Sequence, residues 1–142
     1  MRPYCREFLE RMSSKFELVI FTAGREDYAN KMIDVIDPGK KLITHRLYRQ
    51  HCSNFNGVCI KDFRKFGNRK IEDMIIIDNY IYSYGCNLQN GIPIKPYIEG
   101  ADDVELRFIA DNLDGLKSFM DSAVYIDKVF SLQSYYDYLL RI

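Results

Sequence analysis

The sequence has no excess of charge of either sign. Twenty lysine and arginine residues balance twenty aspartate and glutamate residues, so the formal net charge at pH 7 is zero. Binding to nucleic acid or to an anionic membrane surface depends largely on basic charge. We therefore expect no direct nucleic-acid partner, and any charged ligand must be met by a local group of side chains.

The four cysteines lack the spacing of a zinc site. Cys5, Cys52, Cys59 and Cys86 form no C-x-x-C pair, and the chain has only two histidines. Structural zinc sites need closely spaced sulfur and nitrogen ligands, so zinc is not expected. Small secreted domains are much denser in cysteine. We interpret the four as free thiols in a reducing compartment, with disulfides as the less favoured alternative.

Long hydrophobic runs and low-complexity segments are also missing. No apolar stretch approaches the ~18 residues of a membrane span, and no signal peptide precedes Arg2. At 142 residues and 47% hydrophobic composition, the chain can bury the core of one domain. These features predict a soluble, intracellular protein with a single domain over residues 1–142.

Helical periodicity appears in four segments of the sequence. The first follows Pro3, the second follows Gly24 and ends at residues 37–39, the third is capped by Asp102, and the last lies near the end of the chain. The residues expected to share one helix face are, in order, Tyr4, Phe8 and Met12; Tyr28, Met32 and Ile36; Leu106, Ile109, Leu113, Leu116 and Met120; and Phe130, Tyr135 and Leu139.

Strand signals alternate with these helices. We expect strands at 17–21, 74–78 and 92–94, and the almost wholly apolar run before Asp78 is typical of a parallel strand covered on both faces. Short strands between about residues 42 and 61 surround Asn56-Gly57, a strong hairpin signal, and predict a small β insertion. The pattern as a whole predicts an α/β fold with a parallel sheet.

Three polar residues stand where apolar runs end. Thr22, Lys61 and Asp78 offer a hydroxyl, an ammonium and a carboxylate. Open α/β sheets bind ligands beyond the carboxyl ends of their strands, so these groups are candidates for a phosphate and magnesium site. Thr22, with Ala23, could accept phosphate at a helix N-terminus. Taken alone, Thr22 is better explained as a cap of the helix beginning near Arg25, and the two roles are compatible.

The other candidates also have ordinary explanations. Lys61 can neutralise a phosphate, although a lysine before an aspartate is a common surface pair. Asp78 needs a partner or a metal if it is ionised at a buried strand end, and Asn79 extends the same polar tip. Arg49, at the end of an expected strand over 47–49, could bind a phosphate or a peptide carbonyl, or could be a solvated charge.

Taken together, these segments carry a family resemblance. RPYCREFLERMSSKFELVIFTAG, DYANKMIDVIDP, HRLYRQHCSNFNGVCIKDF, IIIDN and NGIPIKPY follow one another from Arg2 to about Leu116. They resemble the RNA polymerase II C-terminal-domain phosphatases and NLI-interacting-factor-like phosphatases of the haloacid dehalogenase superfamily. The resemblance implies a haloacid-dehalogenase-like, Rossmann-like parallel sheet with helices on both faces.

The resemblance also implies roles for individual residues. Thr22 and Lys61 would hold a phosphoryl group, with Ala23 beside them, and Asp78 and Asn79 would form the Mg²⁺ site. Tyr28 and Arg49 would contact the substrate, a protein or peptide carrying phosphoserine. With so few carboxylates we expect weak Mg²⁺ affinity in the absence of phosphate. The resemblance adds the nucleus as a candidate compartment.

One part of the family pattern is absent from these residues. Such phosphatases attack with the first aspartate of a D-x-D-x-T strand, which would lie before Arg2, and Asp62, Asp102 and Asp103 are poor replacements. We therefore expect an N-terminally incomplete phosphatase domain that is inactive as this chain. The alternative is a non-catalytic phosphopeptide-binding or scaffold protein of the same family. By the resemblance, the missing strand would lie in the centre of the sheet, so the edges of its two neighbouring strands would be unpaired. We expect the chain to self-associate through these edges rather than to pair the two edges directly with each other.

Overall fold

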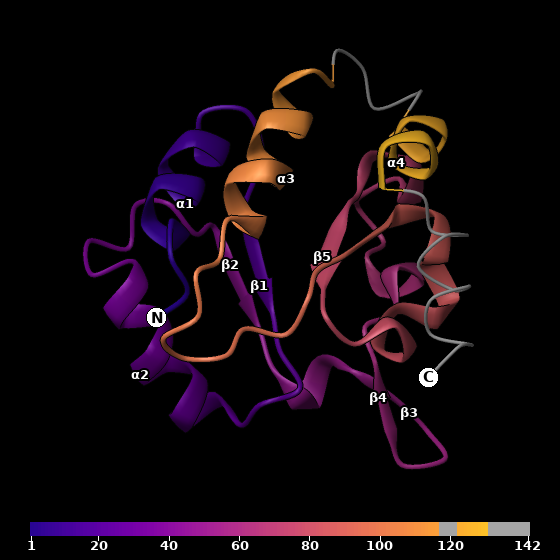
Figure 1. Cartoon of the computed structure of the whole chain (residues 1–142). Helices are drawn as coiled ribbons and strands as arrows, with labels where there is room; N and C mark the ends of the chain where they lie inside the picture. The colour runs from indigo at the N-terminus through magenta and orange to yellow at the C-terminus, as the bar shows by residue number, and fades with distance from the viewer. Residues whose placement is uncertain (117–121, 131–142) are drawn as a thin grey trace. The chain divides into compact units, whose positions relative to one another are not determined.

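The structure is a computed structural model, and it describes residues 1–116 and 122–130 (Figure 1). Packing divides the chain into two compact units. The first unit comprises Met1–Cys59 with Tyr97–Asp111, and the second comprises Ile60–Pro96 with the described residues from Asn112 onward. The single domain over 1–142 and the insertion at 42–61 remain predictions. Within residues 1–116 and 122–130, every helix is too short or too polar to span a lipid bilayer.

The first unit is built on two parallel strands with helices packed beside them. Its elements are α1 (Cys5–Ser13), β1 (Val19–Phe21), α2 (Glu26–Ile36), β2 (His45–Leu47), η1 (Arg49–His51), β3 (Ser53–Phe55) and most of α3 (Glu105–Asp114). In the ladder between β1 and β2, Ile20 lies opposite Arg46. The buried core consists of Leu9, Ala29, Ile33, Ile43 and Tyr48.

Helices α1 and α3 lie side by side in this unit (Figure 1). The guanidinium of Arg11 pairs with Asp111 at 2.7 Å, and that of Arg107 lies 4.9 Å from the centre of the Tyr4 ring. These contacts cross from the first helix to the third, so they tie together segments about 100 residues apart in sequence.

The buried face of α2 differs from the prediction. Ala29 and Ile33 are buried, whereas Tyr28 is 66% and Met32 is 53% exposed. Two apolar stripes run along this helix, and periodicity alone could not choose between them. The stripe that contains the small Ala29 packs inward, and the bulkier tyrosine and methionine remain outside. The predicted shared face of Tyr28 and Met32 with Ile36 is therefore not the core face.

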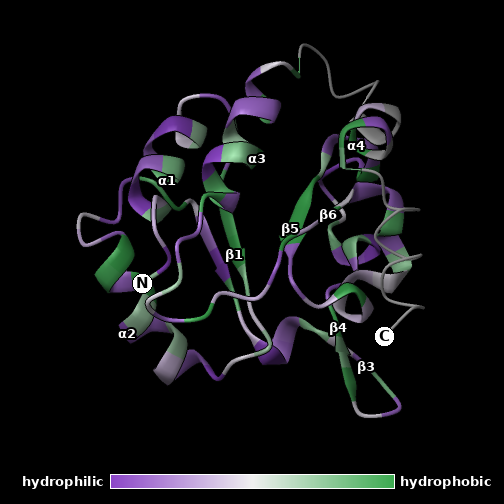
Figure 2. Cartoon of the chain, viewed as in Figure 1, coloured by the Kyte–Doolittle hydropathy of each residue, from purple (hydrophilic) through white to green (hydrophobic). Residues whose placement is uncertain are grey.

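The second unit also holds a parallel pair, β5 (Ile76–Asp78) and β6 (Gly91–Pro93), with Ile77 opposite Ile92. Figure 2 shows β5 as strongly hydrophobic, as expected for a covered strand. Short helical turns η2 (Phe63–Lys65) and η3 (Ile71–Asp73), the longer η4 (Ile81–Asn90) and helix α4 (Ser122–Phe130) complete the unit. Its core contains Phe63, Ile76, Ile81 and Tyr84.

Strand β4 (Val58–Ile60) pairs with β3, and Asn56-Gly57 joins the two. Both turn residues have positive φ, 49° at Asn56 and 83° at Gly57. Positive φ at both central positions is the geometry that favours Asn-Gly in two-residue hairpins. The hairpin signal read from the sequence is therefore confirmed at this position.

The sequence did not predict η4. This segment is a kinked series of 3-10 turns, interrupted at Tyr84 and Asn87, so it has no helical periodicity to detect. Buried asparagines fix it instead: the Asn90 amide donates to the carbonyls of Ile71 at 2.8 Å and Met74 at 2.9 Å. A hydrogen-bonded asparagine cannot be told from a surface asparagine by pattern.

Three further expectations need correction. β2 ends at Leu47, and Arg49 opens η1 because the Tyr48 N–H donates to His51 Nδ1 at 2.9 Å and turns the chain. Asp103, not Asp102, accepts the Glu105 N–H at the start of α3. That helix ends at Asp114, before Leu116. Met120, Tyr135 and Leu139 lie outside the described residues.

Candidate functional site

A buried ion pair lies in the second unit at the end of β5. Lys61 Nζ and a carboxylate oxygen of Asp78 are in direct contact, and their side chains are only 12% and 9% exposed. Ser83 Oγ donates to the same carboxylate at 2.9 Å. The backbone N–H of Tyr80 donates to its other oxygen at 2.8 Å. We call Lys61, Asp78 and Ser83 the lysine–aspartate cluster.

The backbone holds this cluster from both sides. Lys61 follows β4, and its N–H donates to the Ser83 carbonyl at 2.6 Å. The Asn87 amide donates to the Lys61 carbonyl at 3.2 Å. Segment η4 therefore positions the lysine through Ser83 and Asn87, two residues that the sequence analysis missed. Serine and asparagine are common in turns, so no signal in the sequence singled them out.

The chemistry of Asp78 suits Mg²⁺ only in part. Carboxylate oxygens are suitable ligands, and Mg²⁺ is commonly held by one or two carboxylates together with substrate phosphate and waters. Among the described residues, however, no group of three or more His, Cys, Asp or Glu side chains comes together. Both Asp78 oxygens already accept hydrogen bonds, and Asn79 is exposed. The donor set therefore fits Mg²⁺ only with a bound phosphate to complete it.

In the first unit, the loop that follows β1 carries Thr22, Ala23 and Gly24, which we call the threonine loop. The Thr22 N–H donates to the Leu47 carbonyl at 2.9 Å and extends the pairing with β2. The Thr22 hydroxyl accepts the Gly24 N–H at 3.0 Å. Arg25 is the N-cap of α2 and has no side-chain cap. The interpretation of Thr22 as the cap is therefore wrong, because its hydroxyl closes a local turn instead.

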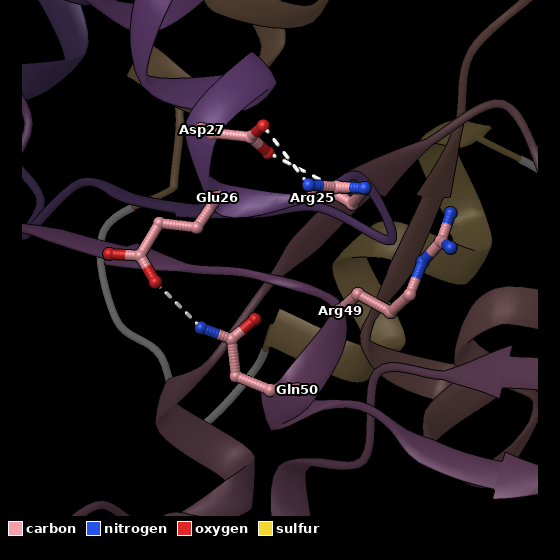
Figure 3. Close-up of a pocket in the computed structure, with 5 residues that line it drawn as sticks. All are labelled: Arg25, Glu26, Asp27, Arg49 and Gln50. Atoms are coloured by element: carbon pink, nitrogen blue, oxygen red, sulfur yellow. Dashed lines mark hydrogen bonds and ion pairs between the residues drawn. The ribbon is translucent and has the colours of Figure 1, made fainter.

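Arg49 contacts the threonine loop. Its Nε donates to the Ala23 carbonyl at 2.7 Å, and its backbone N–H donates to the Gly24 carbonyl at 3.1 Å. The guanidinium is otherwise exposed, and it extends away from Gln50 (Figure 3). The structure thus brings Arg49 into contact with Ala23, next to Thr22, although Arg49 lies 26 residues after Ala23 in the sequence.

In an open pocket beside this loop, most of the charged side chains are paired with a neighbouring side chain. Its lining residues are Arg25, Glu26, Asp27, Arg49 and Gln50. Arg25 pairs with Asp27 at 3.2 Å and Gln50 donates to Glu26 at 2.8 Å, as Figure 3 shows. The side-chain hydrogen bond from Arg25 lowers the pKa of Asp27. Arg49 has no carboxylate partner among the lining residues.

The two units divide the predicted site residues between them. Lys61, Asp78 and Asn79 belong to the second unit. Thr22, Ala23 and Arg49 belong to the first unit, as does Tyr28, which projects from α2 with 66% of its surface exposed.

Asp62 and Asp103, two of the three aspartates considered as replacements for the nucleophile, are engaged in structural contacts. Asp62 accepts hydrogen bonds from Arg64 Nε at 2.8 Å and from the second guanidinium nitrogen at 2.7 Å. This side-chain bond from Arg64 lowers the pKa of Asp62 against the effect of burial. Asp103 pairs with Arg2 at 2.8 Å. Each carboxylate is therefore already committed to an arginine.

Comparisons with known proteins agree with the resemblance read from the sequence. The family model of the NLI interacting factor-like phosphatases matches residues 1–124. CTD small phosphatase-like protein 3 of Caenorhabditis elegans is 40% identical over 82% of this chain and 40% of its own length. CTD small phosphatase-like protein 2 of Dictyostelium discoideum is 40% identical over 92% of this chain and 23% of its own length.

A solved structure gives the same result for the fold. The RNA polymerase II CTD phosphatase Fcp1 of fission yeast, bound to beryllium fluoride, matches 76% of this chain with a TM-score of 0.61 and 27% identity. The match covers 29% of the Fcp1 chain, so this sequence spans less than half the length of each of these three proteins. The predicted haloacid-dehalogenase-like α/β fold is confirmed. The chain belongs to the NLI interacting factor-like phosphatase family.

Proposed function

We propose that this chain is the phosphate-holding part of a Mg²⁺-dependent protein phosphatase that acts on phosphoserine or phosphothreonine. The observation that carries the proposal is the lysine–aspartate cluster, in which Lys61 is buried beside Asp78 and fixed by η4. A buried ion pair is a weak source of stability, because desolvation offsets most of its attraction. A role in binding therefore explains this buried pair better than a role in stability does.

The lysine has spare capacity for a phosphate. An ammonium group has three donors, and the structure shows one of them on Asp78. Lys61 can therefore donate to a phosphate oxygen while it keeps its contact with the carboxylate. In the first unit, Thr22 and Ala23 offer a hydroxyl and a backbone N–H to phosphate, and Arg49 and Tyr28 contact the substrate peptide. Mg²⁺, when bound through Asp78 with Asn79 nearby, supplies positive charge that stabilises the phosphoryl oxygens.

The group that attacks phosphorus is not among these residues. The 142 residues contain no Asp-x-Asp sequence, and Asp62 and Asp103 are held by arginines. Phosphoryl transfer through a covalent intermediate needs a positioned nucleophile. The chain as given therefore binds phosphate esters without hydrolysing them.

Ligand-induced stabilisation tests the binding role. Tungstate or phosphate should raise the melting temperature, because a ligand that binds only the folded state stabilises it. Lys61→Met should lose most of that rise, and the matched control Lys70→Met, at an exposed lysine of the same unit, should keep it. An equal rise in both variants would contradict the proposed role of Lys61.

A second candidate function is a non-catalytic binding or scaffold protein of the same family. Such a protein would use the same phosphate-holding residues and would need no Asp-x-Asp sequence, which these 142 residues do not contain. The two candidate functions predict different results when a D-x-D-x-T strand is joined to the N-terminus of the chain. A phosphatase segment should then release phosphate from a phosphoserine peptide, whereas a scaffold should bind the peptide and leave it intact.

A further inference from the structure

Two exposed tyrosines follow the lysine–aspartate cluster. Tyr80 is 51% and Tyr82 is 67% exposed, and their ring centres lie 5.5 Å apart with an angle of 58° between the planes. Aromatic rings contribute large apolar contact areas, and grouped exposure of apolar surface commonly marks an interaction site. The two rings contact each other and still present more than half of their combined surface to solvent.

The turn that carries these rings is fixed to the cluster. The Tyr80 N–H donates to Asp78 at 2.8 Å, and the Ser83 N–H donates back to the Tyr80 carbonyl at 2.9 Å. Ser83 in turn contacts Asp78 through its hydroxyl and Lys61 through its carbonyl. The rings therefore project from a short, hydrogen-bonded turn that begins two residues after the carboxylate.

We propose that Tyr80 and Tyr82 form a specificity site for a large apolar side chain close to the phosphorylated residue of a substrate peptide. The inference rests on the proposed function. A peptide whose phosphate reaches Lys61 extends about 3.3 Å per residue, so its near neighbours fall within reach of this turn. Tyrosine has few rotatable bonds, so an aromatic platform on a fixed turn loses little entropy when it binds. A leucine or phenylalanine side chain is the ligand that such a surface fits.

Paired phosphoserine peptides test this site. Two peptides differ only in having leucine or glycine two residues from the phosphoserine, and their affinities for the chain are measured by fluorescence anisotropy. Burial of a leucine side chain predicts about tenfold tighter binding of the leucine peptide. The double variant Tyr80→Ser with Tyr82→Ser should bind both peptides equally, while Tyr80→Phe with Tyr82→Phe should restore the preference.

Two controls separate the possible failures. Ile98→Ser, a change at an exposed apolar residue of the first unit, should keep the preference for leucine. The tungstate-induced rise in melting temperature should be unchanged in the double serine variant, which shows that the phosphate site is intact. The tyrosine site would be refuted if the double serine variant kept the preference for leucine. It would also be refuted if the parent chain bound tungstate but showed no preference between the peptides. Neither result would contradict the proposed function. Failure of tungstate and both peptides to bind would overturn the proposed function together with the tyrosine site.

Discussion

At the scale of single residues, the buried carboxylates of this chain are stabilised by different kinds of partner. Lys61 and Asp78 neutralise each other and Asp62 pairs with Arg64, whereas the salt bridges among the described residues include none of Asp37. Asp37 is instead matched by backbone donors. The consequences of removing one partner therefore differ between these sites.

The first prediction concerns the Lys61–Asp78 pair. Lys61→Met leaves a buried carboxylate without its cation, and such a change typically costs about 3 kcal/mol of unfolding free energy. Asp78→Asn should cost a similar amount. The double variant should be more stable than the sum of the two losses predicts, because it leaves no unmatched charge. Urea unfolding of the four proteins measures this coupling, and strictly additive losses would show that the pair does not interact in solution.

The second prediction concerns acid stability. Burial raises the pKa of Asp37, but hydrogen bonds from the backbone N–H groups of Ile43, Lys41 and Leu42 outweigh it, so the pKa is lowered. A lowered folded-state pKa gives stability that is present above the unfolded pKa of about 3.9 and is lost as the pH falls through the folded value. Asp37→Asn should therefore be less stable than the parent chain at pH 7 and should lose less stability on acidification.

Urea unfolding at pH 7, 5 and 3 measures this dependence. Glu99→Gln, at an exposed acid in a loop, is the matched control and should retain the acid sensitivity of the parent chain. Equal loss of stability on acidification in the parent chain and in Asp37→Asn would contradict the assignment.

At the scale of elements, close packing between η4 and β6 fixes the second unit. The Tyr84 ring is fully buried against Gly91, the first residue of β6. A Cβ atom on Gly91 would lie 2.1 Å from Tyr84 Cε2 and 2.6 Å from Cδ2. These separations are far inside van der Waals contact, so this glycine is needed for space rather than for backbone freedom.

Gly91→Ala should therefore destabilise the chain by at least about 2 kcal/mol, because the ring or the strand must move. Tyr84→Leu should cost stability alone but recover part of the loss when it is combined with Gly91→Ala. Gly67→Ala is the matched control, because nothing lies within 4 Å of a Cβ atom at that position. Thermal unfolding of the four variants and the parent chain measures these effects. Equal effects of the two glycine substitutions would contradict the packing described here.

Elements with strong local signals were predictable from the sequence. The apolar run of β5 located the strand whose last residue is Asp78, and Asn56-Gly57 located the hairpin. The prediction failed for segments whose conformation or buried face depends on tertiary contacts. The choice between the two stripes of α2 depends on what packs against Ala29, and η4 depends on hydrogen bonds from Asn87 and Asn90 to distant carbonyls.

The candidate site could likewise be predicted only in part from the sequence. Lys61 and Asp78 stand at the ends of apolar runs, so the sequence indicated both. Their direct contact, and the donors from Ser83 and Tyr80 that complete it, depend on how η4 folds back. Arg49 was a candidate, but its bond to Ala23 required the turn at η1 that the sequence did not reveal.

At the scale of the whole molecule, each unit carries a short sheet with an edge. Among the described strands, β1 pairs with β2 alone and β5 pairs with β6 alone. Strand edges recruit other strands unless charge or a covering segment blocks them. We therefore propose that the isolated chain self-associates, and we expect dimers or larger species in sedimentation at micromolar concentration.

Val19→Lys tests this proposal, because it places a charge on β1 at a residue that is 41% exposed. It should shift the chain toward monomer. Val35→Lys, on the exposed side of α2 at 63% exposure, is the matched control and should leave the association unchanged. A monomeric parent chain, or loss of association only in Val35→Lys, would refute association through a strand edge.

We propose above that these 142 residues hold phosphate but do not include the group that attacks it. The most direct test is hydrolysis of p-nitrophenyl phosphate with Mg²⁺ by the parent chain and by Asp78→Asn, under conditions where tungstate binding is already shown. Neither protein should release p-nitrophenol faster than a blank without protein. Turnover by the parent chain that Asp78→Asn abolishes would contradict this proposal, because a nucleophile would then be present among these 142 residues.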